Sequence, residues 1–303
     1  MFPVPDDAAT PPHQSLTGGE AAGAAAGDKS GRAAGTGNVI SQGAGTASSA
    51  GGSQSLDTPP SLAVRYPWAV FIVPYALYLA LTALEPTPAG TSGWFGWTIP
   101  YAAYPIVYTV KLLVVMACMA LLWQGYRQFP FKLSPLAIGV GAVGVVLWVG
   151  LCKLALERAI FTALGLEGVL GAGERSAFNP LEHYADRPLL ACGFLAVRFW
   201  GLAAIVPVIE EFFLRGFAMR YFLQFDWWNA PFGKLTPAAL AVGTLVPVLS
   251  HPLSEMLAVL VWFSLVTWLM WRTRNIWDCV VAHMVTNFLL GVWVVASGDW
   301  QLM

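Results

Sequence analysis

Seven runs of apolar residues, each close to the length of a membrane-spanning helix, constrain the fold of this chain more than any other feature. A helix needs roughly 20 mostly apolar residues to cross a bilayer. The runs lie at approximately 67–84, 104–124, 135–156, 189–209, 236–250, 255–271 and 276–296. The fourth continues as a more polar helix to about 223, and the fifth is short. We therefore expect an all-α, polytopic transmembrane helical bundle with about seven spans, within a range of six to eight.

The scarcity of charge agrees with this architecture. Only 11% of the 303 residues are charged and 57% are hydrophobic, whereas a soluble domain carries about a quarter charged residues. The formal net charge of −1 argues against nucleic acid as a partner, because neutralising phosphates needs clustered Lys and Arg. We therefore expect the lipid bilayer to surround most of the chain.

The chain divides into two parts of different composition. Residues 1–60 are rich in Gly, Ala and Ser, and such a segment cannot bury enough apolar surface to fold. We expect a disordered N-terminal tail at 1–60 and a transmembrane helical domain at 62–300. Lys and Arg near the ends of the runs alternate between the two sides, which predicts a cytoplasmic N-terminus and a C-terminus outside.

The densest charge within an apolar run is the group Glu210, Glu211 and Arg215. An ionisable side chain at membrane depth costs about 2.5–3.5 kcal/mol on insertion scales. Glu211 and Arg215 are four residues apart, so they face each other on a helix and can pair, while Glu210 lies about 100° further round. That pairing leaves Glu210 with the chemistry of a general base or acid. The alternative is that both glutamates are interfacial.

Three more polar residues lie within or directly after the last apolar runs. His251 follows the end of the fifth run, and alone it is more typical of an interfacial histidine. His283 and Asn287 are four residues apart and share one helix face. The alternative role for this pair is an interhelical hydrogen bond, worth about 0.6–2 kcal/mol. Two polar groups on one face favour a polar cavity, and we expect them to converge there with Glu210.

These residues resemble the motifs of a known family. The motifs E-E-x-x-x-R, F-x-x-x-H and H-x-x-x-N/D are matched by Glu210-Glu211 with Arg215, by His251, and by His283 with Asn287. They define the CPBP family, the CAAX-protease and bacteriocin-processing (abortive infection) membrane peptidases. The surrounding sequence is most similar to the CAAX-protease-related branch associated with exosortase systems. The resemblance covers about residues 62–300 and places a peptidase core at 189–296.

One position departs from the family pattern. Pro247 stands where the second motif has Phe, four residues before His251. A proline inside a helix removes a hydrogen bond and kinks or shortens the helix. We expect a change in local helix geometry, consistent with the short fifth run.

The resemblance also implies roles for the matched residues. Glu210, with His251, would activate a water on the scissile carbonyl, and His283 and Asn287 would stabilise the oxyanion. Glu211 and Arg215 would form a supporting pair. The implied activity is that of an intramembrane endopeptidase in the cytoplasmic (inner) membrane of a bacterium. Its substrate would be a membrane-associated or C-terminally tagged protein in an exosortase-linked sorting pathway.

Zinc is the one cofactor that these residues could bind. Glu210, His251 and His283 could supply a two-histidine, one-carboxylate zinc site. A general base with oxyanion donors suffices for hydrolysis without a metal. We expect hydrolysis that requires no cofactor.

Two other classes of protein stay open. The first is a catalytically inactive membrane scaffold or immunity protein on the same fold. The second is a proton- or ion-coupled transporter, for which intramembrane Glu and His are common. Transporters tend to show two related halves, whereas the polar residues here are confined to one half. The residues carry no signature of an oligomeric state.

Overall fold

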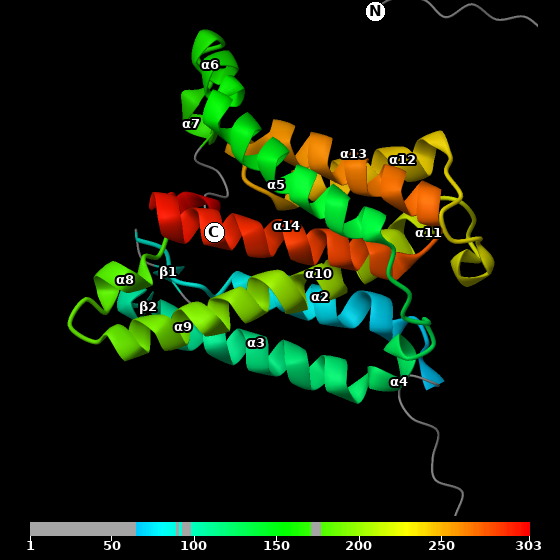
Figure 1. The fold of residues 1–303 in the computed structure, drawn as a ribbon, viewed down its shortest axis with the longest axis horizontal. Coiled ribbons are helices and arrows are strands. Elements are labelled where there is room, and N and C mark those ends of the chain that lie inside the picture. Colours follow the sequence, from blue (N-terminus) through cyan, green and yellow to red (C-terminus); the bar gives the residue numbers. More distant parts are fainter. Residues whose placement is uncertain (1–64, 89–90, 93–97, 171–176) are drawn as a thin grey trace, which may run out of the picture. The chain divides into compact units, whose positions relative to one another are not determined.

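A computed structural model describes residues 65–88, 91–92, 98–170 and 177–303 (Figure 1). All of these residues belong to one compact unit, Asp57–Met303. The tail at 1–60, predicted to be disordered, lies outside the described residues. The described part is mostly helical, and its one small sheet pairs the two-residue strands β1 (Thr91–Ser92) and β2 (Thr98–Ile99) in antiparallel fashion.

The described residues contain five helical stretches long and apolar enough to cross a membrane, together with two shorter apolar helices. The helices on these stretches are α3 (Tyr104–Leu121), α5 (Pro135–Leu154), α9 (Pro188–Trp200) with its continuation, α13 (Met256–Thr273) and α14 (Ile276–Ser297). The two shorter helices are α2 (Ala69–Thr82) and α12 (Pro237–Ser250). They match the seven predicted runs in order, and the predicted polytopic helical bundle is confirmed.

Short helices connect the long ones. They are η2 (Tyr101–Ala103), α4 (Trp123–Tyr126), α6 (Leu156–Ala163), α7 (Glu167–Leu170), α8 (Pro180–His183), η5 (Trp227–Asn229), η6 (Leu253–Glu255) and η7 (Trp300–Leu302). The long connection between α5 and α9 therefore contains helical turns.

Local sequence signals set several helix ends. The Thr236 side chain accepts a hydrogen bond from the backbone N–H of Ala239 and caps α12. Asn275 does the same for α14 through Trp277. These short polar side chains satisfy N–H groups that have no partner within the first turn. Helix α14 stops at Gly298, whose φ of 78° favours glycine.

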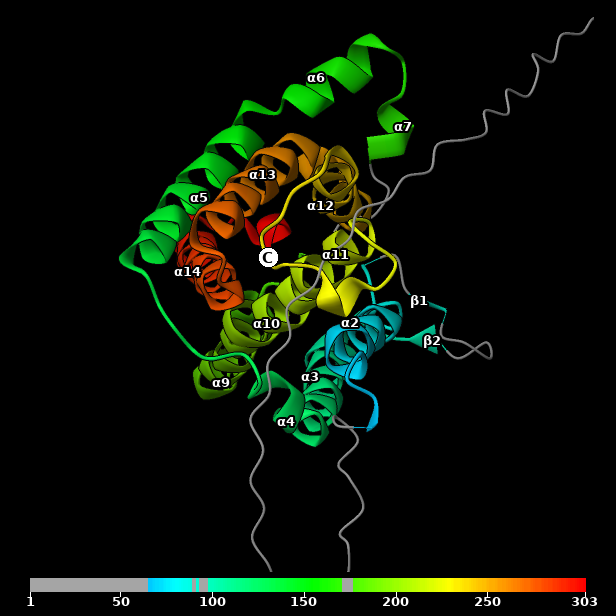
Figure 2. The same cartoon turned by 90° about the vertical axis from the view of Figure 1, so that its right-hand side faces the viewer.

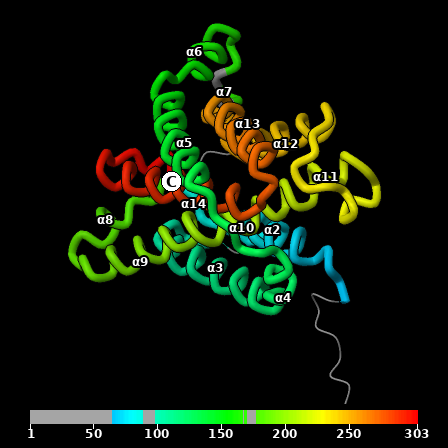
Figure 3. The backbone as a smooth tube through the Cα atoms, turned by 45° about the vertical axis from the view of Figure 1, so that its right-hand side comes forward, coloured from blue at the N-terminus to red at the C-terminus, as the bar shows by residue number. Residues whose placement is uncertain are grey.

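The glutamate-bearing helical segment lies in the middle of the bundle. Helix α14 packs most extensively on α5, α13 packs on α5 and α12, and α2 packs on α3. Seen end-on, α5, α12, α13 and α14 form one group and α2 and α3 lie apart from it (Figure 2). Helix α10 (Val206–Glu211), in the continuation of α9, contacts both α14 and α2 (Figure 3). A side chain on α10 is therefore covered from both sides.

Two glycines let α5 approach α13 and α14 closely. A Cβ at Gly144 would lie 2.6 Å from Trp262 Nε1 and 2.7 Å from Thr286 Oγ1, and a Cβ at Gly141 would lie 2.6 Å from the carbonyl oxygen of Ala282. Trp262 Nε1 donates to Thr286 Oγ1 (3.1 Å), and that hydroxyl donates to the Gly141 carbonyl oxygen (2.9 Å). Small residues with hydrogen bonds across the contact are typical of helix packing in membranes.

Candidate active site

The helical segment that carries the glutamates is interrupted twice by π-helical hydrogen bonding. Helix α9 is followed by η3 (Gly201–Ile205), α10, η4 (Phe212–Ala218) and α11 (Met219–Tyr221). The two π-helical stretches, η3 and η4, flank α10, which ends with Glu210 and Glu211. Such stretches occur frequently at functional sites. The sequence predicted the continuous helix but not these stretches.

Glu211 lies at the centre of a buried polar chain. Its carboxylate pairs with Arg215, and neither side chain is exposed to solvent. This is the pairing predicted from the four-residue spacing. Glu211 Oε1 also lies 3.0 Å from Nδ1 of His283 on α14, a contact that the sequence did not predict. Arg215 further donates to the carbonyl oxygen of Phe263 on α13 (3.2 Å), so the chain links three helices.

Glu210 approaches the same imidazole from its other side. Its Oε2 lies 3.8 Å from Nε2 of His283, which is beyond the range of a direct hydrogen bond. Glu210 is buried but lines a cavity. The two neighbouring glutamates therefore differ in surroundings, because Glu211 is held by Arg215 within the protein and Glu210 lies in the wall of the cavity.

His283 is fixed in orientation by two contacts. Glu211 holds Nδ1, and the ring of Trp262 packs edge-to-face at 4.5 Å between centroids. An imidazole whose Nδ1–H is donated to a carboxylate has its tautomer and ring plane set by that bond. Nε2 is therefore the nitrogen that His283 presents toward Glu210.

His251 lies at the end of α12 and is oriented by the backbone of that helix. Its Nδ1 is 2.9 Å from the Pro247 carbonyl oxygen and 3.3 Å from Ser250 Oγ. Helix α12 continues three residues beyond Pro247 and ends before Pro252. A residue that precedes proline avoids the helical region, and His251 has φ −115° and ψ 161°. Pro252 thus accounts for the end of the helix, and Pro247 supplies the carbonyl that holds the imidazole.

Asn287 contacts the first π-helical stretch. Its Nδ2 donates to the carbonyl oxygen of Leu202 in η3 (2.9 Å). A π turn departs from the usual i to i−4 ladder, and the amide supplies a donor there. An asparagine amide carries two N–H donors. One of them makes an interhelical hydrogen bond, which is the alternative considered for this residue from its sequence.

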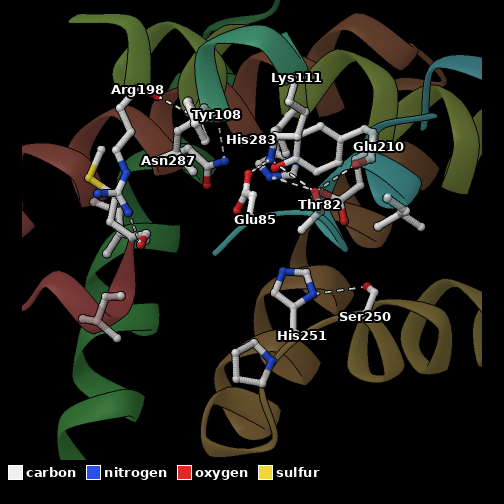
Figure 4. A pocket seen from close by; sticks show the side chains of 18 of the residues that line it. Thr82, Glu85, Tyr108, Lys111, Arg198, Glu210, Ser250, His251, His283 and Asn287 are labelled. Atoms are coloured by element: carbon white, nitrogen blue, oxygen red, sulfur yellow. Dashed lines mark hydrogen bonds and ion pairs between the residues drawn. The ribbon is translucent and has the colours of Figure 1, made fainter. Parts of the chain in front are cut away.

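The four residues predicted to be catalytic line one cavity, and the supporting pair of Glu211 and Arg215 does not. Glu210, His251, His283 and Asn287 all line a cavity of ≈ 320 Å³, which is within the size range of small-ligand sites. His251 lies across the cavity from Glu210 and His283 (Figure 4). The side chains come from α10, α12 and α14, so segments separated by tens of residues form one polar space.

A buried lysine in the same cavity was not among the predicted site residues. Lys111, near the middle of α3, is 2% exposed and pairs with Glu85, which follows α2. Its Nζ also donates to Thr82 Oγ1 (3.2 Å) and lies 4.1 Å from the ring centroid of Tyr78. A lysine inside the apolar run 104–124 was the sequence signal that could have identified it.

A buried arginine marks another part of the cavity wall. Arg198 on α9 donates to the carbonyl oxygens of Phe178 (2.7 Å) and Met303 (2.5 Å). It interrupts the apolar run 189–209 as Lys111 interrupts its own. An ionisable residue inside a span points to a functional site by default, and this rule would have singled out both.

Glu210, His251 and His283, the residues considered as zinc ligands, do not form a compact group in the described part of the chain. A structural or catalytic zinc ion needs at least three protein ligands grouped around one point. In the described part of the chain, no three His, Cys, Asp or Glu residues form such a group. Nδ1 of His283 is engaged by Glu211, and Nδ1 of His251 faces the Pro247 carbonyl, so Nε2 is the nitrogen that each imidazole offers to a ligand.

Fold and site together define a multi-pass membrane protein with a buried carboxylate–imidazole centre. Residues 193–289 match the family model described as type II CAAX prenyl endopeptidase Rce1-like. No curated protein and no solved structure matches the chain. The matched stretch is less than half of the chain, yet it contains all six motif residues. This similarity supports an intramembrane protease at the level of class. The match does not identify the exosortase-associated branch.

Proposed function

We propose that this chain is an intramembrane endopeptidase that hydrolyses a peptide bond with a glutamate-activated water and without a metal. The observation that carries the proposal is the convergence of Glu210, His251 and His283 on one buried cavity. The similarity of residues 193–289 to CAAX endopeptidases supports it independently. A carboxylate and two imidazoles in a secluded space are the components of general acid–base hydrolysis.

In the proposed reaction, Glu210 and His251 hold a water between them. Glu210 takes a proton from this water while the oxygen atom of the water attacks the scissile carbonyl carbon. The proton is then delivered to the leaving amine when the C–N bond breaks. A positioned general base contributes about 10²–10⁴ in rate. His251 keeps its orientation because Pro247 engages Nδ1.

The developing oxyanion receives hydrogen bonds from His283 and Asn287. His283 can donate through Nε2 when its ring carries both protons, because Glu211 then binds Nδ1–H. Asn287 contributes the amide hydrogen that Leu202 does not use. Glu211 and Arg215 act as positioning residues, since they hold His283 and do not reach the substrate. Preorganised donors of this kind are worth about 10²–10³ in kcat each.

The membrane and substrate of the proposal follow from the family resemblance, and the orientation follows from the distribution of Lys and Arg near the span ends. The protein would lie in the cytoplasmic membrane of a bacterium with its N-terminus inside. Its substrate would be a membrane-associated or C-terminally tagged protein, and the exosortase-linked sorting pathway would supply it.

The proposal is tested with the full chain purified in detergent and incubated with candidate C-terminal peptides, with products identified by mass spectrometry. Cleavage by the wild type should be lost in Glu210→Gln and His251→Ala. It should persist in a chelator. Cleavage that survives Glu210→Gln would refute the assignment of the base. A cellular phenotype unchanged by both substitutions would favour the inactive scaffold instead.

A further inference from the structure

The two ends of the helical bundle differ in positive charge. The helices alternate in direction, so the starts of α2, α5, α12 and α14 lie at the same end as the last residues of α3, α11 and α13 (Figure 1). That end carries Arg65, Arg127, Lys132, Arg220, Lys234, Arg272 and Arg274. We call it the basic end. Among the described residues, the segments at the opposite end carry Lys153, Arg158 and Arg187.

The excess of Lys and Arg orients the bundle. Lys and Arg in short loops stay on the cytoplasmic side during insertion, and acidic residues contribute little to this choice. The three connections at the basic end are short, and each has two cations within it or in the last turn of the helix before it. The basic end is therefore the cytoplasmic end, and the end that holds α6, α8 and η7 faces the other side of the membrane.

The cavity lies in the half of the bundle away from the basic end. Its wall uses the second half of α2 and the residues after it, up to Thr87. It also uses the first half of α3, the end of α12 at His251, and Met303 beyond α14. No residue of the connections at the basic end lines it.

Two short helices explain why a hollow forms there. Helices α2 and α12 each have 14 residues and rise about 21 Å at 1.5 Å per residue. The hydrocarbon core is about 30 Å thick. Both helices start at the basic end, so they stop about 9 Å short of the opposite boundary. The segment after α2 and the His251-Pro252 turn after α12 are the parts that line the cavity.

We propose that the cavity is reached from the non-cytoplasmic side, and that its substrate is a protein segment that has already crossed the membrane. This inference rests on the proposed peptidase function and names the substrate class for it. A segment still in the cytoplasm meets the basic end, whose connections contribute no residue to the wall of this cavity. A translocated segment meets the end where α2 and α12 stop.

The test is cysteine accessibility in the full chain, expressed in the cytoplasmic membrane of a bacterial host. The native cysteines, of which Cys192 is exposed, are first replaced by alanine. Single cysteines are then introduced as Ser250→Cys in the cavity wall, Glu182→Cys on α8 and Gln128→Cys at the basic end. Intact cells receive MTSET, a charged thiol reagent that does not cross membranes. Unmodified thiols are then counted after lysis by a polyethylene-glycol maleimide gel shift.

We expect MTSET to abolish the gel shift of Ser250→Cys and Glu182→Cys in intact cells, and that of Gln128→Cys only after permeabilisation. Modification of Gln128→Cys from outside would overturn the orientation. A Ser250→Cys that stays unmodified beside a modified Glu182→Cys would overturn access from that side. Thr82→Cys, on the opposite wall, replaces Ser250→Cys if that variant fails to accumulate. None of these results needs cleavage, so a failure here is distinct from a failure of the detergent peptide assay.

Discussion

The neighbouring glutamates offer a sharp test, because neutralising each should have a different effect on stability. Glu211→Gln removes the partner of Arg215, and both side chains are fully buried. Breaking a buried ion pair on one side leaves an uncompensated charge and costs about 3–5 kcal/mol. Glu210→Gln alters a carboxylate that faces the cavity, 3.8 Å from His283. We expect its stability to stay within about 1 kcal/mol of wild type, since burying a neutral amide costs less than burying a charge.

Cleavage should be lost in both variants, but for different reasons. Glu210→Gln removes the base and lowers kcat by about 10²–10⁴. Glu211→Gln displaces His283, which loses its charged partner at Nδ1. A variant that keeps its stability and loses its activity identifies Glu210 as the group that acts on the water.

The assay is unfolding by SDS titration from mixed micelles, followed by tryptophan fluorescence, alongside the peptide cleavage assay. Asp186→Asn is the matched control. Asp186 and Arg187 are exposed and 3.7 Å apart, and such pairs contribute little. This control should change neither readout. A Glu211→Gln variant as stable as wild type, or a Glu210→Gln variant destabilised to the same extent, would show that the two carboxylates do not differ in this way.

Three further predictions concern packing, the oxyanion and metal. Gly144→Ala should destabilise the bundle by about 1–3 kcal/mol through overpacking, because the new Cβ meets Trp262 at 2.6 Å. Gly139→Ala on the same helix has open space around it and should be neutral or stabilising by up to about 1 kcal/mol; equal effects in SDS titration would contradict this. Asn287→Ala should lower kcat by about 10²–10³ with little change in KM, measured by steady-state kinetics; an unchanged kcat would leave Asn287 with only its bond to Leu202. Cleavage should continue in millimolar EDTA, and a loss that added zinc restores would disprove the metal-independent mechanism.

The sequence predicted the helices well because their signal is local. A run of apolar residues needs no knowledge of its neighbours, and the predicted spans agree with the observed helices to within a few residues. The pairing of Glu211 with Arg215 was also local, since four residues make about one helical turn. Convergence of the polar residues on one cavity was predicted for two reasons. Each polar side chain costs free energy at membrane depth unless it lies in a polar space, and the family resemblance groups these residues in one site.

The contacts between helices were beyond the reach of the same reasoning. The bond from Glu211 to His283 joins residues 72 positions apart, and no spacing rule relates α10 to α14. Pro252 restricts the backbone of His251 and so ends α12, an effect that the sequence alone could have shown, whereas the short fifth run was attributed to Pro247. Lys111 and Arg198 were visible as single charges in apolar runs, yet neither belongs to a motif.

The π-helical stretch η3 has a consequence for the alignment of the cavity wall. Arg198, Leu202, Val206 and Glu210 all line the cavity at four-residue intervals. On an uninterrupted α-helix each interval advances by about 40°, so the last residue would be turned about 120° from the first. A π turn takes up about one residue more than an α turn and brings that offset back to about 20°. A one-residue deletion within Gly201–Ile205 would therefore restore regular winding and keep Glu210 at about the same 20° offset from Arg198, whereas regular winding of the full-length segment would turn its carboxylate by about 100° away from that face.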